Sequence, residues 1–599
     1  MSDKSVRKVT FGRIFWPSLV AIIVASFISM LLFFTVLGGI IGSFINPTTT
    51  EAKSGPVLHM TLEGQISEGS SKFNPTSMGM ESKIGISDIL YGLEAAKKDK
   101  SIKGVFLELK NLQCGFASAR EIRNAINDFE KSGKFVVSYN GGEVITQKEY
   151  YVSSAADENY AFPTSTMEFI GLGAELMFFK NTLDKLEVEM QVIRGNNNDF
   201  KSAVEPFFRT DMSDSSRVQI EKYLSSIWMD IRTDISKDRK VTVEELNDIA
   251  ENVKIHRAQD AVGLKMLDGT KYKDEVLAIV AKKAGKESIL EKDMIAFEKY
   301  AQKGLIDNQS SVIKSKSANV AVILAEGDVS VSGDGLSSDK ICKYVREARE
   351  DKSIKTIVLR VNSPGGSALA SDEIWREVQL ANKTKKVIVS MGDVAASGGY
   401  YIASPADRIF AEPTTITGSI GVFGTIPFIG NMLENKLGLT FDRAQTNKHS
   451  VMSLNRKLTP EELAMIQTEV DAIYAQFLNR VSEGRGIAVE KVNQMARGRV
   501  WTGTDAKNIG LVDELGGLKD AINYAAKKAG IKDVSVRYWP EKKTDRLTEF
   551  IETITDSESA EMMTQTKMPE NLIYYYEQLK KLEGMQGIQM RMPYEIILR

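Results

Sequence analysis

Two short stretches decide the fold: TIVLRVNSPGGS at residues 356–367 and KVIVSMGDVAASGGYY at residues 386–401. Each begins with a β-branched run of strand length and continues into a glycine-rich turn. Between them, residues 371–382 carry apolar side chains at helical spacing. A helix that joins two such strands predicts a βαβ unit, with parallel strands in a sheet covered by helices. The sequence therefore predicts an α/β fold.

The same pattern occurs earlier in the chain, which indicates an internal duplication. Two pentapeptides occur twice: DKSIK at residues 99–103 and 351–355, and AKKAG at residues 281–285 and 526–530. Between them further matches keep their order and spacing, such as Tyr150-Tyr151 with Tyr400-Tyr401. Colinear matches of this kind indicate one structural unit used twice. We expect an N-terminal copy at 55–315, a C-terminal copy at 316–540 and a tail at 541–599, to which no chemistry is assigned.

The overall composition excludes several classes of protein. The 77 Lys and Arg residues nearly balance 79 Asp and Glu, so the net charge of -2 gives no electrostatic reason to expect nucleic acid as a partner. Two cysteines cannot build a disulfide framework, and with only three histidines a metal centre is not expected either. We expect no metal and no cofactor.

Residues 14–45 contain no charged side chain. A membrane-spanning helix needs about 20 apolar residues, whereas the apolar part of a cleaved signal peptide, the alternative interpretation, has about 7 to 15. Four basic residues and one acidic residue precede the run, so the positive-inside rule leaves residues 1–13 in the cytoplasm. We expect a single transmembrane signal anchor at 14–45, with the body of the chain on the periplasmic side of a bacterial inner membrane.

Ser397 is the candidate nucleophile. It lies between alanines and glycines where a strand is expected to meet a helix, so its hydroxyl is unshielded and backbone N–H groups lie beside it. The Pro-Gly-Gly turn at 364–366 is a candidate source of a second N–H, because glycine allows close approach of the backbone to a substrate oxygen. These features suit acyl transfer, but the same pattern also fits structural glycine turns of an α/β sheet.

A serine hydroxyl needs a base before it can act as a nucleophile. His59 lies in an expected strand, His256 has no histidine counterpart in the second copy, and His449 lies in a polar loop. A Ser-His-Asp arrangement through His449 is one alternative. A lysine is the other, provided that burial lowers its pKa from about 10.4 toward the working pH.

The two copies differ in complementary ways. Where the second copy has Ser397, the first has Gln147, and it also lacks half of the Pro-Gly-Gly turn. The first copy instead carries FKSAVEPFF at residues 200–208, a pattern that the second has lost around residues 450–456. A single active centre, with the serine from the second copy and Lys201 from the first, accounts for both losses.

Four motifs resemble the signal peptide peptidases of the long, duplicated protease IV type. They are SPGG at residues 363–366, ASGGYYIA at 396–403, FKSAVEPF at 200–207 and TGSIGVFG at 417–424. The resemblance covers nearly the whole chain. It implies that each copy has a fold related to the Clp protease and crotonase superfamily, and that a Ser/Lys dyad is split between the copies.

The resemblance also implies a role for each site residue. Ser397 matches the nucleophile, Lys201 the general base, and Ser419 a serine that holds the lysine amine. Gly398, together with Gly365 or Gly366, matches the oxyanion-hole region. These roles are expectations that depend on the family motif.

The implied activity is hydrolysis of signal peptides that remain in the membrane after cleavage, with a preference for apolar or small side chains. The implied assembly is a homotetrameric dome whose opening faces the lipid bilayer. Two alternatives stay open. One is acyl-CoA chemistry on a crotonase-like fold, and the other is a non-enzymatic membrane scaffold or quality-control adaptor with a vestigial site.

Overall fold

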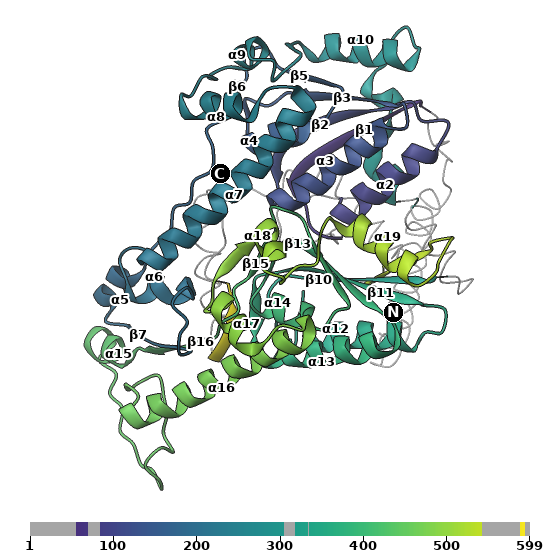
Figure 1. Cartoon of the computed structure of the whole chain (residues 1–599). Helices are drawn as coiled ribbons and strands as arrows, with labels where there is room; N and C mark the ends of the chain where they lie inside the picture. The colour runs from purple at the N-terminus through teal and green to yellow at the C-terminus, as the bar shows by residue number, and fades with distance from the viewer. Residues whose placement is uncertain are drawn as a thin grey trace, which may run out of the picture. The chain divides into compact units, whose positions relative to one another are not determined.

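The computed structural model in Figure 1 describes residues 55–69, 84–302, 304, 318–333, 335–541 and 587–592. The expected cytoplasmic segment 1–13 and the expected anchor 14–45 lie outside these residues. Among the helices that the structure does describe, none combines the length and the apolar character needed to cross a bilayer.

The first copy is built on a six-stranded sheet in the order β8-β5-β3-β2-β1-β9, in which all neighbours pair in parallel. The strands are β1 (Val57–Gln65), β2 (Gly104–Gln113), β3 (Phe135–Asn140), β5 (Glu158–Ala161), β8 (Gly269–Thr270) and β9 (Ile295–Ala296), with a separate pair β4 (Val144–Ile145) and β6 (Thr166–Met167). The helices are α2 (Ile86–Lys98), α3 (Phe116–Glu130), α4 (Gln147–Ser153), α5 (Lys180–Leu186), α6 (Glu205–Phe208), α7 (Asp214–Arg239), α8 (Val243–Glu251), α9 (Ala258–Gly263) and α10 (Lys273–Ala284).

The second copy has an eight-stranded sheet with the main order β17-β15-β13-β11-β10-β19, and β14 and β18 extend it from β13. The strands are β10 (Val320–Glu326), β11 (Thr356–Ser363), β13 (Val387–Ala396), β14 (Arg408–Ala411), β15 (Ile416–Gly418), β17 (Val500–Thr502), β18 (Glu514–Leu515) and β19 (Val536–Trp539). The helices are α12 (Ser338–Glu350), α13 (Ala368–Thr384), α14 (Gly398–Ala403), α15 (Gly430–Leu437), α16 (Pro460–Arg485), α17 (Val489–Met495), α18 (Gly503–Asn508) and α19 (Leu518–Lys528).

The order of elements confirms the internal duplication. The first copy runs β1-α2-β2-α3-β3-α4-β5, and the second runs β10-α12-β11-α13-β13-α14-β14. Each then contains a helix of 26 residues, α7 or α16. Helix α4 therefore occupies the place that α14 has in the second copy.

Helices cover both faces of each sheet. In the second copy, residues of α12, α13 and α16 share an apolar cluster with one face of β10 and β11, and residues of α19 share a cluster with the other face. In the first copy, α2, α3 and α7 share a cluster with one face, and α10 with the other. This two-sided burial explains why Ile357, Val358 and Leu359 of β11 are all apolar, because a parallel strand covered on both faces does not alternate.

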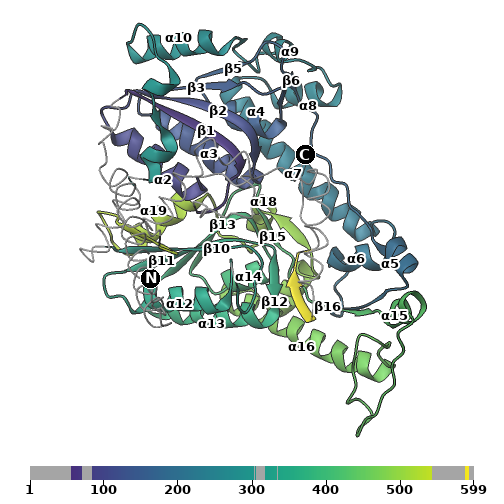
Figure 2. The same ribbon diagram turned by 180° about the vertical axis from the view of Figure 1, so that it is seen from behind.

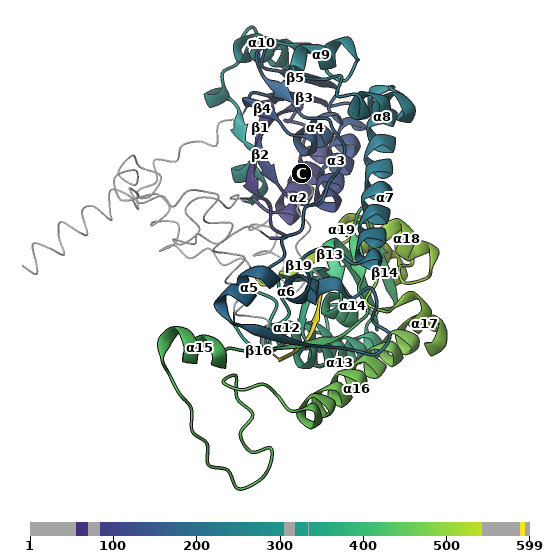
Figure 3. The ribbon, with the colours of Figure 1, turned by 90° about the vertical axis from the view of Figure 1, so that its left-hand side faces the viewer.

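A third sheet joins the two copies. Its order is β12-β20-β16-β7, with β12 (Gly365–Ser367) and β16 (Phe423–Phe428) from the second copy and β7 (Glu189–Arg194) from the first. Strands β7 and β16 run antiparallel over six residue pairs and lie side by side in Figure 1. Strand β20 (Gly587–Arg591), drawn in yellow in Figure 2, comes from the tail and is called the tail strand below. The third sheet therefore joins β7 of the first copy to the part of the second copy that contains the glycine-rich turns. Figure 3 shows α5 and α6 above this sheet.

Candidate active site

Ser397 occupies the turn between β13 and α14, as the sequence predicts. It is the N-cap residue of α14, and its backbone is held at φ 54° and ψ -114°. The Ser397 amide donates to the Gly418 carbonyl at 2.8 Å, and its carbonyl accepts from the Tyr401 amide at 2.8 Å. A positive φ is costly for a residue with a Cβ and is found where the surroundings fix the conformation, often at functional sites. The turn therefore fixes the position of the Ser397 backbone and the direction of its Cα–Cβ bond.

The structure brings Lys201 of the first copy to this serine. Lys201 Nζ lies 2.9 Å from Ser397 Oγ, although the two residues are 196 positions apart in the chain. Both side chains are fully buried. A distance of 2.9 Å is within the range in which a base takes a proton directly from a hydroxyl.

Ser419 lies on the other side of the lysine amine. Lys201 Nζ donates to Ser419 Oγ and to the Ser419 carbonyl, each at 3.0 Å. The backbone of Ser419 has φ 50°, and its amide donates to the Arg499 carbonyl at 2.7 Å. Three oxygens of the second copy therefore fix the direction of an amine that comes from the first.

The surroundings of Lys201 are apolar and lower its pKa. Val204 and Phe207, which follow it in the chain, form a buried cluster with Phe423 of β16, and the amine lies 6.0 Å from the Phe423 ring centroid. Among the described residues, no carboxylate pairs with this amine. Desolvation without a counter-charge disfavours the ammonium form, so the pKa of Lys201 lies well below its ordinary value.

The second copy also holds the backbone around Lys201. The Phe200 amide donates to the Arg497 carbonyl at 3.0 Å. Gly498, with φ 77°, lies against Lys201, and a Cβ added there would come within 2.5 Å of the Lys201 Cβ. A larger residue at position 498 would therefore displace the lysine.

The three glycines expected near the serine do line the loop beside it. Gly365 has φ 101° and Gly366 φ 156°, and a Cβ on Gly398 would come within 2.6 Å of Ser371 Oγ and 3.2 Å of the Gly365 Cα. The Gly365 amide donates to Ser363 Oγ at 3.2 Å. The backbones of the two turns are thus in close contact, and side chains at these positions would separate them.

The tail strand lies along these turns. It pairs antiparallel with β12, where Met590 is opposite Gly366 and Arg591 opposite Gly365, and with β16 on its other side. The Met592 amide donates to the Pro364 carbonyl at 2.6 Å. A Cβ built on Gly365 would come within 2.1 Å of the Met590 carbonyl oxygen and 2.7 Å of the Gly398 amide nitrogen, so both atoms converge beside Ser397. This strand was not predicted from the sequence, although Met590 and Met592 alternate with Gln589 and Arg591 as in a strand.

The structure does not place a histidine at Ser397. His449 Nδ1 lies 3.2 Å from Glu462 and its Nε2 3.8 Å from Glu461. His59 Nε2 lies 2.6 Å from Glu108, and together with Glu291 these residues form a group that Lys273 bridges through both carboxylates. His256 is exposed. The His449 alternative is therefore not supported, and the Lys201 alternative is.

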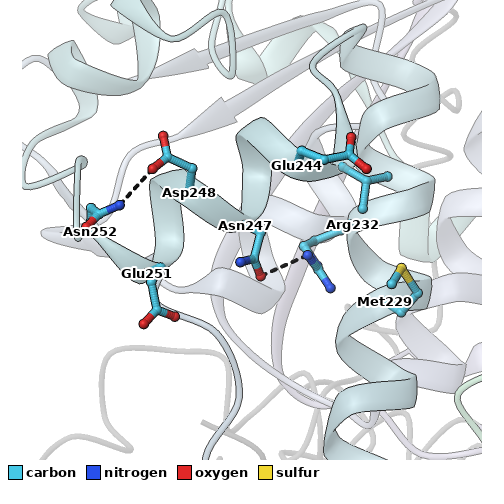
Figure 4. Close-up of a pocket in the computed structure, with 8 residues that line it drawn as sticks. Met229, Arg232, Glu244, Asn247, Asp248, Glu251 and Asn252 are labelled. Carbon is cyan, nitrogen blue, oxygen red and sulfur yellow. Dashed lines mark hydrogen bonds between the residues drawn. The ribbon is translucent and has the colours of Figure 1, made fainter.

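A surface hollow between α7 and α8 lies on the first copy and contains none of these groups (Figure 4). Its lining is mostly polar, with Arg232 donating to Asn247 at 2.8 Å and Asn252 to Asp248 at 2.7 Å. The residues that line it include neither a serine nor a lysine, so it does not compete with the Ser397 site as the place of acyl transfer.

Models of two protein families match the chain. The model described as peptidase family S49 matches residues 128–287 and 379–532, one range in each copy. The model described as Clp protease matches residues 316–416, which include Ser397. The sheets and helices of the second copy therefore have a Clp protease-like arrangement.

Three curated proteins illustrate the similarity. Protease 4 of Salmonella typhi is 33% identical over 469 residues, covering 76% of this chain and 74% of that protein. Protease 4 of Haemophilus influenzae is 33% identical over 481 residues, with 76% of each chain covered. A chloroplastic serine protease SPPA of Arabidopsis thaliana is 34% identical over 491 residues, covering 80% of this chain and 70% of that protein.

Proposed function

Because the chain belongs to peptidase family S49 and is a serine protease, we propose that it is a membrane-anchored endopeptidase that degrades cleaved signal peptides with a dyad of Ser397 and Lys201. The observation that carries the proposal is the 2.9 Å contact between Lys201 Nζ and Ser397 Oγ in a fully enclosed site.

Lys201 acts as the general base in this proposal. Its lowered pKa leaves the amine neutral at a working pH where an exposed lysine is charged. The neutral Nζ takes the proton of Ser397 Oγ while that oxygen attacks the peptide carbonyl, and the resulting ammonium returns the proton to the leaving amine. Water then enters and the same amine activates it to hydrolyse the acyl-enzyme. Ser419 orients Lys201 Nζ through its carbonyl oxygen and its Oγ.

The oxyanion that forms on the carbonyl needs preorganised donors. The Gly398 amide follows the nucleophile directly and begins α14. Gly365 or Gly366 of the neighbouring turn is the candidate for the second donor, and the Gly365 amide donates to Ser363 Oγ in this structure. The close contact of the two turns brings these amides to one side of Ser397.

The tail strand supports an extended peptide as the substrate. Its backbone is paired with β12 and β16, which is how a protease holds a peptide by strand addition. The Met590 and Met592 side chains are buried, so the positions beside Ser397 accept apolar side chains. We propose that a substrate takes the place of the tail strand. Apolar signal peptides fit that requirement.

Membrane anchoring through residues 14–45, a periplasmic catalytic body and a homotetramer complete the proposal. The support for the anchor is the uncharged run and the basic residues before it. The tetramer and the use of signal peptides are supported by the resemblance of the motifs to the duplicated protease IV type.

Peptide hydrolysis tests the proposal. The purified full chain in detergent micelles is given a synthetic signal peptide, and the products are identified by mass spectrometry. We expect internal cleavage that Ser397→Ala and Lys201→Met each abolish while the circular dichroism spectrum is unchanged. Hydrolysis that persists in Lys201→Met contradicts the dyad, and a folded wild-type chain whose Ser397 does not react with a fluorophosphonate favours the scaffold alternative.

A further inference from the structure

Asp393 connects the strand that carries the nucleophile to the first copy. It lies on β13, four residues before Ser397, and its carboxylate is at the N-terminus of α3. Asp393 Oδ2 accepts from the Gly115 amide at 2.9 Å and from Ser118 Oγ at 2.7 Å, and Oδ1 accepts from the Ser118 amide at 2.8 Å. The carboxylate therefore caps a helix of the other copy with three hydrogen bonds.

The duplication shows that this cap is unusual. In the second copy the corresponding helix, α13, is capped within its own chain segment, because Ser367 Oγ accepts from the Ala370 amide at 3.4 Å. The N-cap residue of α3 is Gly115, which has no side chain to accept a hydrogen bond. Helix α3 has thus exchanged its own cap for one from the second copy.

Gly115 is required for this contact. A Cβ at position 115 would come within 2.2 Å of the Asp393 Cγ and 2.6 Å of its Cβ. A serine there, as at position 367 of the second copy, would exclude the Asp393 side chain. The loop of the first copy that lacks the Pro-Gly-Gly turn therefore binds the Asp393 carboxylate instead.

The contact lies on a direct structural route to both catalytic groups. From Asp393 the strand continues through Val394, Ala395 and Ala396, which pair with residues 416–418 of β15, and then reaches Ser397. Strand β15 is followed at once by Ser419, which binds the lysine amine. A shift of β13 relative to the first copy would therefore displace Ser397 and Ser419 together relative to the copy that carries Lys201.

We propose that Asp393 is a positioning residue, which fixes the register between the nucleophile strand and the first copy and so holds Ser397 at hydrogen-bond distance from Lys201. The inference rests on the proposed roles of those two residues. A displacement of about 1 Å at a reacting pair costs about 100-fold in rate, so a small change in register has a large effect.

The test compares two caps in the first copy. Asp393→Ala removes the cap of α3, and Thr242→Ala removes the cap of α8, where Thr242 Oγ1 accepts from the Glu245 amide at 3.1 Å. Activity is measured on the full chain well below both melting temperatures and normalised to folded protein. We expect Asp393→Ala to lower kcat about 10- to 100-fold with KM within about twofold, and to slow labelling of Ser397 by a fluorophosphonate in parallel. Thr242→Ala lowers the melting temperature and leaves kcat unchanged.

Equal kcat values for Asp393→Ala and Thr242→Ala overturn the inference, since Asp393 then acts only as a cap. If Asp393→Ala does not fold, Asp393→Asn decides, because an amide has one acceptor oxygen where the carboxylate has two. A reduced kcat with an unchanged melting temperature supports positioning, and an unchanged kcat contradicts it. Activity that survives Ser397→Ala contradicts the proposed dyad itself, which separates the two failures.

Discussion

Arg360 of β11 and Glu121 of α3 form an ion pair that is enclosed between the two copies, with a distance of 2.5 Å between guanidinium and carboxylate. Arg360 also pairs with Glu68 at 2.7 Å and donates to Ser390 Oγ and the Met391 carbonyl. Burial is tolerated because the charges are paired and hydrogen-bonded. The strand next to β13 is thus bound to the same helix that Asp393 caps.

Arg360→Met should destabilise the chain strongly, because it leaves two buried carboxylates without a counter-charge. Loss of one partner of a buried pair costs about 3–5 kcal/mol of unfolding free energy. Urea unfolding followed by tryptophan fluorescence measures the change. Arg346→Met, which removes the half-exposed pair with Glu377, is the control and should cost at most about 1 kcal/mol. Similar losses of unfolding free energy in the two variants would show that the enclosed ion pair contributes no more stability than the half-exposed pair.

The pH dependence of hydrolysis should report the lysine. Only the neutral amine accepts the Ser397 proton, so kcat/KM should rise with pH through the lowered pKa of Lys201 and then stay level. Because burial lowers this pKa, the rise should be complete well below about pH 10.4, where an exposed lysine titrates. Initial rates of hydrolysis of one peptide, measured between about pH 5 and 10, give the pH profile. A rise centred near the ordinary lysine value would be inconsistent with a buried base.

Lys201→Met should make the protein more stable at neutral pH. The unfolded chain binds a proton at this lysine that the folded chain does not, so stability contributed by the site increases with pH up to about 10.4 and the penalty disappears above it. The variant removes the penalty and keeps the length of the side chain. Its melting temperature should exceed that of the wild type at pH 7, and the difference should shrink above the unfolded pKa. A variant that melts lower at pH 7 would argue that the Ser397 and Ser419 contacts outweigh desolvation.

Ser419→Ala should lower kcat about tenfold. The substitution removes one of the two acceptors that Ser419 offers to Lys201 Nζ. Nζ becomes an ammonium as it takes the Ser397 proton, and loss of a hydrogen bond to that charged group costs about 1.5 kcal/mol. Steady-state hydrolysis measures the effect. Ser404→Ala is the control, since Ser404 is equally buried but donates to the Tyr401 carbonyl. If both variants keep full activity, the lysine does not depend on the Ser419 hydroxyl.

Removal of the tail strand should lower KM for peptides. A substrate that pairs with β12 and β16 has to displace residues 587–592, and an occupied site reduces apparent affinity by the fraction of chains in which it is free. A chain that ends at residue 586 should therefore show a lower KM than the full chain. A chain that ends at residue 592 keeps the tail strand and serves as the control. An unchanged KM after removal of the strand would place the substrate elsewhere.

Much of the fold follows from local sequence patterns. The β-branched runs at 356–361 and 386–390 fall on β11 and β13, and the helical spacing at 371–382 is the centre of α13. The matching pentapeptides correctly predict two copies, because repeated sequence folds into repeated elements. The strand β13 extends to Ala396, beyond its apolar run, since pairing with β15 continues through the polar and small residues.

Part of the candidate site can also be predicted from the sequence, but for a different reason. Ser397 is indicated by the small residues around it, and Lys201 by complementary losses between the copies, a comparison that needs no knowledge of distances. Asp393 and the tail strand were not predicted, because their roles arise from contacts between segments far apart in the chain. An aspartate that follows an apolar run and a short alternating segment are common in any sequence, and only the folded arrangement gives them a specific partner.

The separation of Lys201 and Ser397 by 196 residues has a consequence for the biogenesis of the protein. A nascent chain that has folded only its first copy contains Lys201 without the serine, and a misdocked second copy contains Ser397 without the lysine. On the proposed dyad, neither intermediate is a protease. Proteolytic activity would then appear only after both copies have folded and joined, so that activity itself would report completed folding.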